Sequence, residues 1–266
     1  MTLEQEYRAL REGLRRIEPD AHTFDASSYE PAAVARVRAL WVDRTQNEYR
    51  STFVFSALAS QLLVAGASLE ASAVTLRMAQ DELVHAERCA GVAVALGGTP
   101  PTLPLTGGVA TIAKHANVSR EECALRNVVY TTCISEMTAV AHLTLSLERA
   151  RDPFMRHHIR ALLADETLHG RFGFHYLESW ADWLGDRPGV RASLTRYLRF
   201  AFAVAEREFS WPSRAPGNAD DDALGYVAPQ EIVEIHRNTM EHAVAPALAR
   251  FGLDAEEAYR TRTFAP

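Results

Sequence analysis

Four long helical patterns constrain the fold of this chain more than any other feature. They cover residues 31–67, 69–96, 119–150 and 152–184. A helix of about thirty residues is roughly 45 Å long at about 1.5 Å per residue. Helices of that length are typical of a bundle and too long for a layered domain of helices and strands. No segment has the pattern of a strand, so we expect an all-α protein.

The connections between these patterns indicate how the helices are arranged. Very short turns join the first helix to the second and the third to the fourth, so each pair is expected to form an antiparallel hairpin. Between the pairs, residues 97–118 form a Pro- and Gly-rich stretch long enough to cross the whole bundle. Two further helical patterns follow at 188–210 and 229–250. The sequence thus predicts one domain over residues 1–266, with a bundle at 31–184 and a helical extension at 185–266 packed on it.

Composition excludes several classes of protein. The 266 residues carry a net charge of −6, which argues against nucleic acid or an anionic membrane as the main partner. The N-terminal segment is charged and has no apolar core of a signal peptide, and no apolar run reaches the length of a transmembrane helix. Three cysteines without CxxC spacing fit a reducing compartment. We therefore expect a cytoplasmic protein with no membrane partner.

One polar motif occurs twice inside these apolar helices. Residues 81–86 read DELVHA and residues 165–170 read DETLHG, so both contain Asp-Glu-x-x-His. Glu and His three positions apart lie on one face of a helix, which pairs Glu82 with His85 and Glu166 with His169. A single Glu-x-x-His is a weak signal, because such short motifs arise by chance.

A lone glutamate precedes each motif by about one helix. Glu48 and Glu136 both lie on apolar stripes, 34 and 30 residues before Glu82 and Glu166. In antiparallel hairpins these spacings bring each lone glutamate level with the following motif. Four carboxylates in an apolar interior would be costly without partners, and two divalent cations match their charge. The pattern therefore predicts a two-metal site built from two equivalent halves; a purely structural polar network is the alternative.

This pattern resembles the ferritin-like di-iron carboxylate proteins, in which two helices each supply a Glu and two others each supply a Glu-x-x-His. The resemblance covers about residues 31–184 and implies a ferritin-like four-helix bundle. It also implies six metal ligands, with Glu82 and Glu166 as the expected bridges between two ions. These ligands are Glu48, Glu82, His85, Glu136, Glu166 and His169.

The resemblance further assigns a role to the aspartate in each motif. Asp81 is expected to accept the outer imidazole N–H of His169, and Asp165 that of His85. Carboxylates with imidazoles favour iron or manganese over a metal that prefers thiolates. We expect a pair of iron ions, with a manganese–iron pair as the alternative. Cys89, one turn beyond His85, is expected to fill the core rather than to bind metal.

Proteins with this site carry out several reactions with O2, and fold and ligands do not choose among them. We expect an O2-activating oxidase or oxygenase that acts on a small, largely apolar organic molecule and needs an electron donor. The alternative is a ferroxidase or iron-binding protein. The arylamine N-oxygenases resemble this chain in layout but carry an extra His where this chain has Leu162, which argues against N-oxygenation. A homodimer is left open.

A substrate pocket is expected beside the metals. Gly173 lies one turn after His169 and either leaves room for a substrate or marks a close contact between helices. His142 lies off the metal-facing stripes and is expected to be an ordinary surface or packing residue. The expected pocket residues are Thr52, Phe55, Thr132, Val140 and Gly173.

Overall fold

The computed structural model describes residues 22–99, 112–209 and 217–264, and within these ranges it contains helices and no strand. The expected fold class, all-α, is therefore confirmed. After the short η1 (Ala26–Ser28), the bundle consists of α2 (Pro31–Val64), α3 (Leu69–Ala95), a continuous α4–η2–α5 segment and α6 (Pro153–Ser179). The middle segment comprises α4 (Arg120–Val128), η2 (Val129–Glu136) and α5 (Met137–Arg149).

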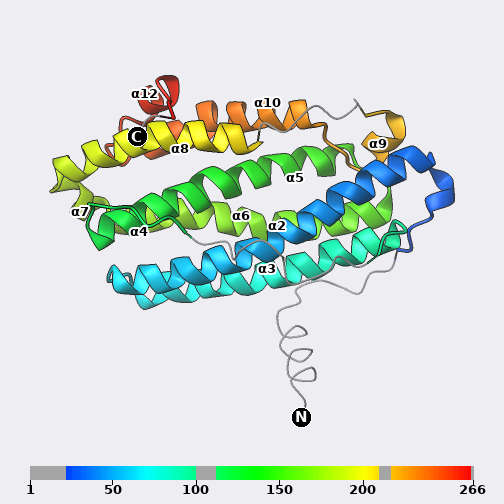
Figure 1. Cartoon of the computed structure of the whole chain (residues 1–266), viewed down its shortest axis with the longest axis horizontal. Helices are drawn as coiled ribbons and strands as arrows, with labels where there is room; N and C mark the ends of the chain where they lie inside the picture. Colours follow the sequence, from blue (N-terminus) through cyan, green and yellow to red (C-terminus); the bar gives the residue numbers. More distant parts are fainter. Residues whose placement is uncertain (1–21, 100–111, 210–216, 265–266) are drawn as a thin grey trace, which may run out of the picture.

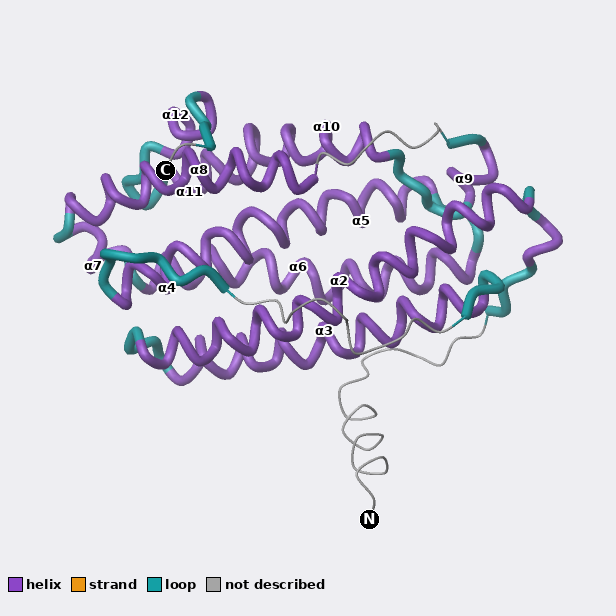
Figure 2. The backbone as a smooth tube through the Cα atoms, viewed as in Figure 1, coloured by secondary structure: helices purple, strands orange, loops and turns teal. Residues whose placement is uncertain are grey.

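The bundle consists of two antiparallel hairpins lying side by side (Figures 1 and 2). Helices α2 and α3 form one hairpin, and the α4–η2–α5 segment forms the other with α6. The end of α3 and the start of α4, which the predicted crossover at residues 97–118 joins, lie at opposite ends of the bundle (Figure 1). Residues 100–111 of this predicted crossover lie outside the described residues.

Helix capping explains where the hairpins turn. The Ser68 hydroxyl accepts a hydrogen bond from the Ala71 amide, and Asp152 accepts one from Met155, so both side chains satisfy free amides at a helix start. Gly66 and Gly97 have φ of +81° and +82° just after α2 and α3. These left-handed conformations suit glycine and close the two helices, which end slightly earlier than the predicted residues 67 and 96.

Two apolar clusters fill the bundle on either side of its middle. One contains Leu58, Met78, Ile134 and Phe172, and the other contains residues such as Trp41, Val92, Leu143 and Leu162. Each long helix contributes to both clusters, and its predicted metal ligands lie in the interval between them. The polar residues therefore form a layer at mid-length, with apolar packing above and below.

The C-terminal residues form further helices. They are α7 (Ala181–Gly185), α8 (Pro188–Phe209), α9 (Ala219–Ala223), α10 (Pro229–Thr239), η3 (Met240–Val244), α11 (Ala245–Ala249) and α12 (Ala255–Arg260). The predicted fourth helix was too long, because α6 ends at Ser179 and α7 is a separate short helix.

Ion pairs from Arg36 and Arg149 help to hold this C-terminal region on the bundle. Arg36 of α2 makes two hydrogen bonds to Asp221 of α9, at 2.9 and 2.6 Å. Arg149 of α5 binds Glu231 of α10, with Nη1 2.9 Å from Oε2. Helix α10 packs on α5 and α8 and covers the outer side of α5 (Figure 1).

Two segments of π-helix interrupt runs that the sequence predicted as uniform α-helix. The first, η2, spans eight residues and ends at Glu136. The second, η3, directly precedes α11, which contains Pro246. Proline within a helix removes an amide donor and clashes with the preceding turn, and a π segment relieves this conflict. No helix in the described ranges is both long and apolar enough to cross a membrane.

Candidate metal centre

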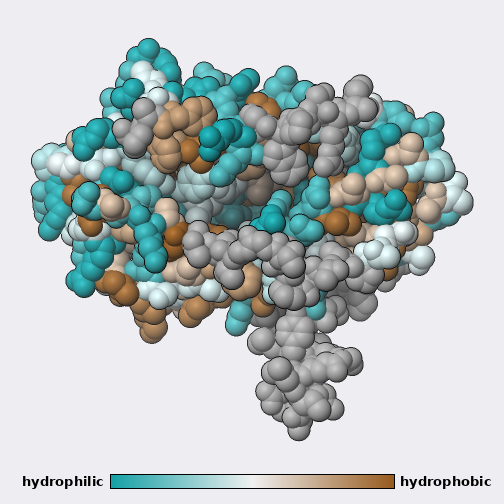
Figure 3. Space-filling model, viewed as in Figure 1, coloured by the Kyte–Doolittle hydropathy of each residue, from teal (hydrophilic) through white to brown (hydrophobic). Residues whose placement is uncertain are grey.

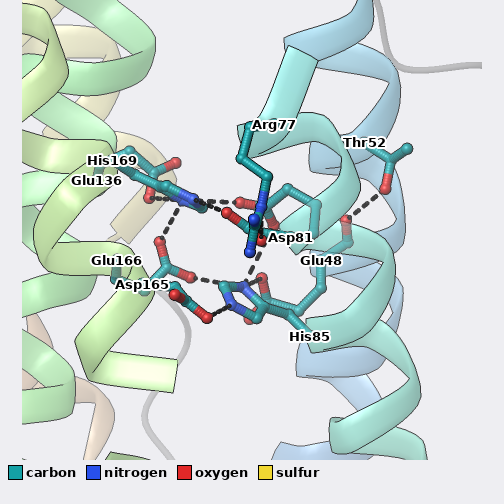
Figure 4. Close-up of polar contacts among 10 residues, drawn as sticks. Glu48, Thr52, Arg77, Asp81, His85, Glu136, Asp165, Glu166 and His169 are labelled. Atoms are coloured by element: carbon teal, nitrogen blue, oxygen red, sulfur yellow. Dashed lines mark hydrogen bonds and ion pairs between the residues drawn. The ribbon is translucent and has the colours of Figure 1, made fainter. Parts of the chain in front are cut away.

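All six predicted ligands come together at the middle of the bundle (Figure 4). They form two groups, in each of which four side chains offer ligand atoms within 4.8 Å of one another. The first group is Glu48, Glu82, His85 and Glu166, and the second is Glu82, Glu136, Glu166 and His169. Glu82 and Glu166 belong to both groups, so the two groups are adjacent and share two carboxylates.

The two histidines face the centre with the same nitrogen. Nδ1 of His85 lies 3.2 Å from Oε1 of Glu166, and Nδ1 of His169 lies 3.1 Å from Oε2 of Glu166. Nδ1 of His169 is also 3.2 Å from Oε1 of Glu82. Glu166 therefore lies between the two imidazoles, with one oxygen directed at each (Figure 4).

The opposite nitrogen of each imidazole faces an aspartate from the other motif. Nε2 of His85 lies 3.4 Å from Asp165, and Nε2 of His169 lies 3.5 Å from Asp81. These are the pairs that the repeated motif indicated. An aspartate at Nε2 holds the ring in place and leaves the inner nitrogen available as a ligand. Asp81 is also bound by Arg77 at 2.6 Å.

Burial strongly changes the protonation of this cluster. Glu82, His85 and His169 are each 1% exposed. Burial, followed by repulsion from Glu82 and Glu166, raises the pKa of Glu48 well above its usual range. Although burial also raises the pKa of Glu166, hydrogen bonds from His169 and His85 outweigh it and hold that pKa well below its usual range.

Burial and neighbouring charges also shift the pKa values of Glu136 and of the two histidines. Burial and then Glu166 raise the pKa of Glu136. Burial alone would lower the pKa of both histidines, but carboxylate neighbours, beginning with Asp165 for His85 and Asp81 for His169, raise it well above the usual value. Without a metal, these directions favour protons on Glu48, Glu136 and both imidazoles.

This donor set fits two divalent cations. Both carboxylate oxygens of Glu82 are fully buried, and in the described parts of the chain neither makes a hydrogen bond of good geometry, although Nδ1 of His169 lies 3.2 Å from Oε1. The inner Nδ1 of His85 is also buried and faces carboxylate oxygens of the cluster, the nearest of them 3.2 Å away on Glu166. Four glutamates carry the charge that two divalent cations neutralise, and metal binding would displace the protons that the cluster otherwise holds. Carboxylate and imidazole donors suit iron or manganese.

A cavity of about 250 Å³ lies directly beside the cluster. Glu48, Glu82, Glu136 and Glu166 all line it, so the cavity reaches both ligand groups. The end of α8 and the start of α10 contribute Phe209, Pro229 and Ile232 to its lining. Its remaining walls are side chains of α2, η2 and α5: Leu40, Asp43, Arg44, Asn47, Ser51, Ser135, Thr138, Ala139, His142 and Leu143. This face of the molecule is hollowed near its centre (Figure 3).

None of the five predicted pocket residues lines this cavity. Phe55 is 1% exposed in the core, and its ring centroid lies 5.8 Å from that of His169. A Cβ atom at Gly173 would lie 2.1 Å from Oγ1 of Thr132 and 2.6 Å from Sγ of Cys133. Gly173 thus marks a close contact between α6 and η2 rather than open space. The cavity lies on another side of the cluster, between α2 and α5, and Thr52 and Val140 do not reach it.

Several residues of this cavity were not identified from the sequence. Arg44 lies four residues before Glu48 and hence on the same helical face, a spacing that could have indicated it. His142, expected to be an ordinary surface or packing residue, also lines the cavity. Its position depends on how α5 faces α2, so the sequence alone carried no signal for it.

Comparison with solved structures found a similar helical protein. "Protein 19 with aldehyde deformylating oxidase activity from Synechococcus" aligns with a TM-score of 0.51 and 18% identity, over 86% of this chain and 94% of that one. The two proteins share a fold. The predicted ferritin-like helical bundle is thereby confirmed. Comparisons with protein-family models and with curated proteins gave no match.

Proposed function

We propose that this protein is a non-haem di-iron oxidase or oxygenase that uses O2 to oxidise a small, largely apolar organic molecule. One observation carries the proposal. Two adjacent ligand groups share Glu82 and Glu166, and their glutamates also line a cavity large enough for a small molecule. The similarity in fold to a protein with aldehyde deformylating oxidase activity supports the same class of chemistry.

Each ligand group is proposed to hold one iron ion. Glu48 and His85 would bind the first ion and Glu136 and His169 the second, with Glu82 and Glu166 bridging the two. A manganese–iron pair is the alternative. When bound, two ferrous ions supply two electrons to O2, and an unidentified electron donor would restore them.

The protein itself contributes position, charge and the exclusion of water. Asp165 and Asp81 orient the two imidazoles through their outer nitrogens. Apolar clusters pack on both sides of the polar layer and exclude water from those two sides. The cavity has apolar walls at Leu40, Ala139 and Leu143, which favours an organic substrate over a path for hydrated iron.

Anaerobic loading with Fe(II), followed by O2, tests the proposal. Elemental analysis should find two irons per chain. Addition of O2 should then oxidise those irons once and stop until an external reductant is added. Fewer than one iron per chain would contradict the metal site. Sustained oxidation of many Fe(II) ions per chain, with a mineral product, would show a ferroxidase instead.

The proposal also includes the cellular compartment and the oligomeric state of the protein. A reducing compartment such as the cytoplasm would suit ferrous iron, and the three cysteines, Cys89, Cys123 and Cys133, are free thiols. A homodimer is compatible with this function but is not required by it, because all six proposed ligands come from one chain.

A further inference from the structure

The wall of the cavity beside the glutamates contains an arginine and a histidine that lie close together. Arg44 and His142 lie there, on α2 and α5, with Nη2 of Arg44 3.5 Å from Nδ1 of His142. Arg44 lies one turn before Glu48, at a rise of about 6 Å along α2. If Arg44 binds one end of a ligand, the ligand atoms several bonds from that end would therefore lie beside the glutamates.

The guanidinium of Arg44 has no carboxylate partner within the described ranges. Its contacts there are His142 and the ring of Trp41, whose centroid lies 5.2 Å from Cζ. Asp43 also lines the cavity, but it interacts with another residue and forms no ion pair with Arg44. Arginine prefers a carboxylate or phosphate that accepts two hydrogen bonds, and Arg44 has neither.

His142 presents a second unused donor on the same wall. Burial and then the charge of Arg44 lower the pKa of His142 to about 3, so the ring is neutral. Arginine only donates hydrogen bonds, so Nδ1 facing Arg44 is the acceptor and the proton lies on Nε2. Nε2 is buried and has no hydrogen-bond partner among the residues that the structure describes. An unsatisfied buried donor beside an unpaired cation suits an anionic acceptor.

We propose that the substrate is a small carboxylate whose acidic group is bound by Arg44 and His142. The inference rests on the proposed function, because it takes the cavity to be the substrate site. A cavity of 150 Å³ holds benzene, so the cavity of about 250 Å³ accommodates roughly ten non-hydrogen atoms by the same scale. The apolar part of the molecule would extend past Ala139 towards Glu48 and Glu136.

Binding of hexanoate, compared with hexanamide, tests this assignment. The two probes have the same size and differ in charge. Titration calorimetry on the full chain, metal-free and loaded anaerobically with Fe(II), should show hexanoate binding at least about tenfold more tightly. Arg44→Gln should remove this preference and leave hexanamide binding unchanged, and Arg44→Lys should restore part of it. Arg50→Gln, an exposed change on the same helix, is the control.

Several results would overturn the carboxylate assignment. Equal affinity for the two probes would do so, as would hexanoate binding that Arg44→Gln leaves unaffected. Inorganic phosphate competing as well as hexanoate would indicate a general anion site. Failure of the proposed function is recognised separately, by an iron content below one per chain. If Arg44→Gln lowers the unfolding temperature, the comparison of the two probes on the unaltered protein still decides.

Discussion

At the scale of single residues, the cluster depends on how each imidazole is held. Nε2 of His85 lies 3.4 Å from Asp165, and no other acidic side chain is found at that nitrogen in the described ranges. Asp81, in contrast, is shared between His169 and Arg77. Asp165 therefore offers the cleaner test of whether these aspartates support metal binding.

Replacing Asp165 with Asn should weaken metal binding or slow iron oxidation by about 10–100-fold, because the amide is a poorer acceptor for the imidazole N–H. Iron affinity from an anaerobic competition titration measures this effect. Asp186→Asn, an exposed change of the same kind, should have no effect. An Asp165→Asn variant with unaltered affinity and oxidation rate would show that the aspartate has no such role.

His236 makes the stability of the fold depend on pH. Burial lowers its pKa to about 4, and its Nδ1 lies 3.0 Å from Oγ1 of Thr138. In the unfolded chain the pKa of histidine is about 6.5, so the unfolded state binds more protons between these values. The stabilisation by neutral His236 is thus fully present above about pH 6.5 and is lost as the pH falls towards 4.

At pH 4.5 this loss amounts to roughly 2.5 kcal/mol, from about 1.36 kcal/mol per pKa unit. The free energy of unfolding of the metal-free protein should therefore fall more between pH 7 and 4.5 than that of His236→Gln. Urea titrations at both pH values measure the difference, and contributions from the glutamates cancel in the comparison. Equal falls in the two proteins would mean that His236 is already able to accept a proton in the folded state.

At the scale of secondary-structure elements, the π-helix η2 is held by its contact with α6. Gly173 lies opposite Thr132 and Cys133 so closely that no side chain fits. The hydroxyl of Thr132 donates a hydrogen bond to the carbonyl of Val128, the last residue of α4, at 2.6 Å. Since η2 ends at Glu136, this contact fixes the position of one proposed ligand.

Gly173→Ala should accordingly destabilise the protein, by about 1–3 kcal/mol, because a methyl group is forced into a packed interface. Gly91→Ala is the matched control on α3, where a Cβ atom has no neighbour within 4 Å. That change should be neutral or stabilising by about 0.5–1 kcal/mol, since alanine favours a helix. Urea unfolding measures both. Equal behaviour of the two variants would argue against the close contact.

At the scale of the whole molecule, the C-terminal helices complete a cavity that the bundle alone leaves open. Pro229 and Ile232 of α10 line the cavity. Glu231, which lies between these two residues in the sequence, is bound by Arg149 of α5. Glu231 also accepts a hydrogen bond from the Ala228 amide at the start of α10. The cavity wall thus depends in part on the ion pair between Arg149 and Glu231, beside a longer one from Arg149 to Asp222 of α9 at 3.7 Å.

Replacing Arg149 with Met should loosen the start of α10, so that substrate affinity falls several-fold while two irons remain bound. Hexanoate titration and elemental analysis measure the two properties on the same sample. Arg151→Met, an exposed change nearby, should leave both unaltered. Loss of iron in step with hexanoate affinity would show that α10 supports the metal ligands rather than the cavity.

The sequence by itself determined the all-α bundle, its two hairpins and which six residues would meet. Helical periodicity defines the face on which Glu82 and His85 lie, and similar spacings of 34 and 30 residues bring Glu48 and Glu136 level with their partner motifs. The repeated aspartate indicated the crossed pairs with the histidines, because two equivalent halves related by antiparallel packing leave each outer nitrogen facing the opposite motif.

Only the tertiary structure decided where the cavity lies and what surrounds it. Residues Thr52, Phe55 and Thr132 share helices with the ligands, but whether a neighbouring side chain meets solvent or packing depends on rotation and distance between helices. The π-helix before Glu136 and the close approach at Gly173 leave no local pattern in the sequence. Arg44 and His142 meet across 98 residues of chain because α2 and α5 are antiparallel and adjacent there, a relation that periodicity within either helix does not contain.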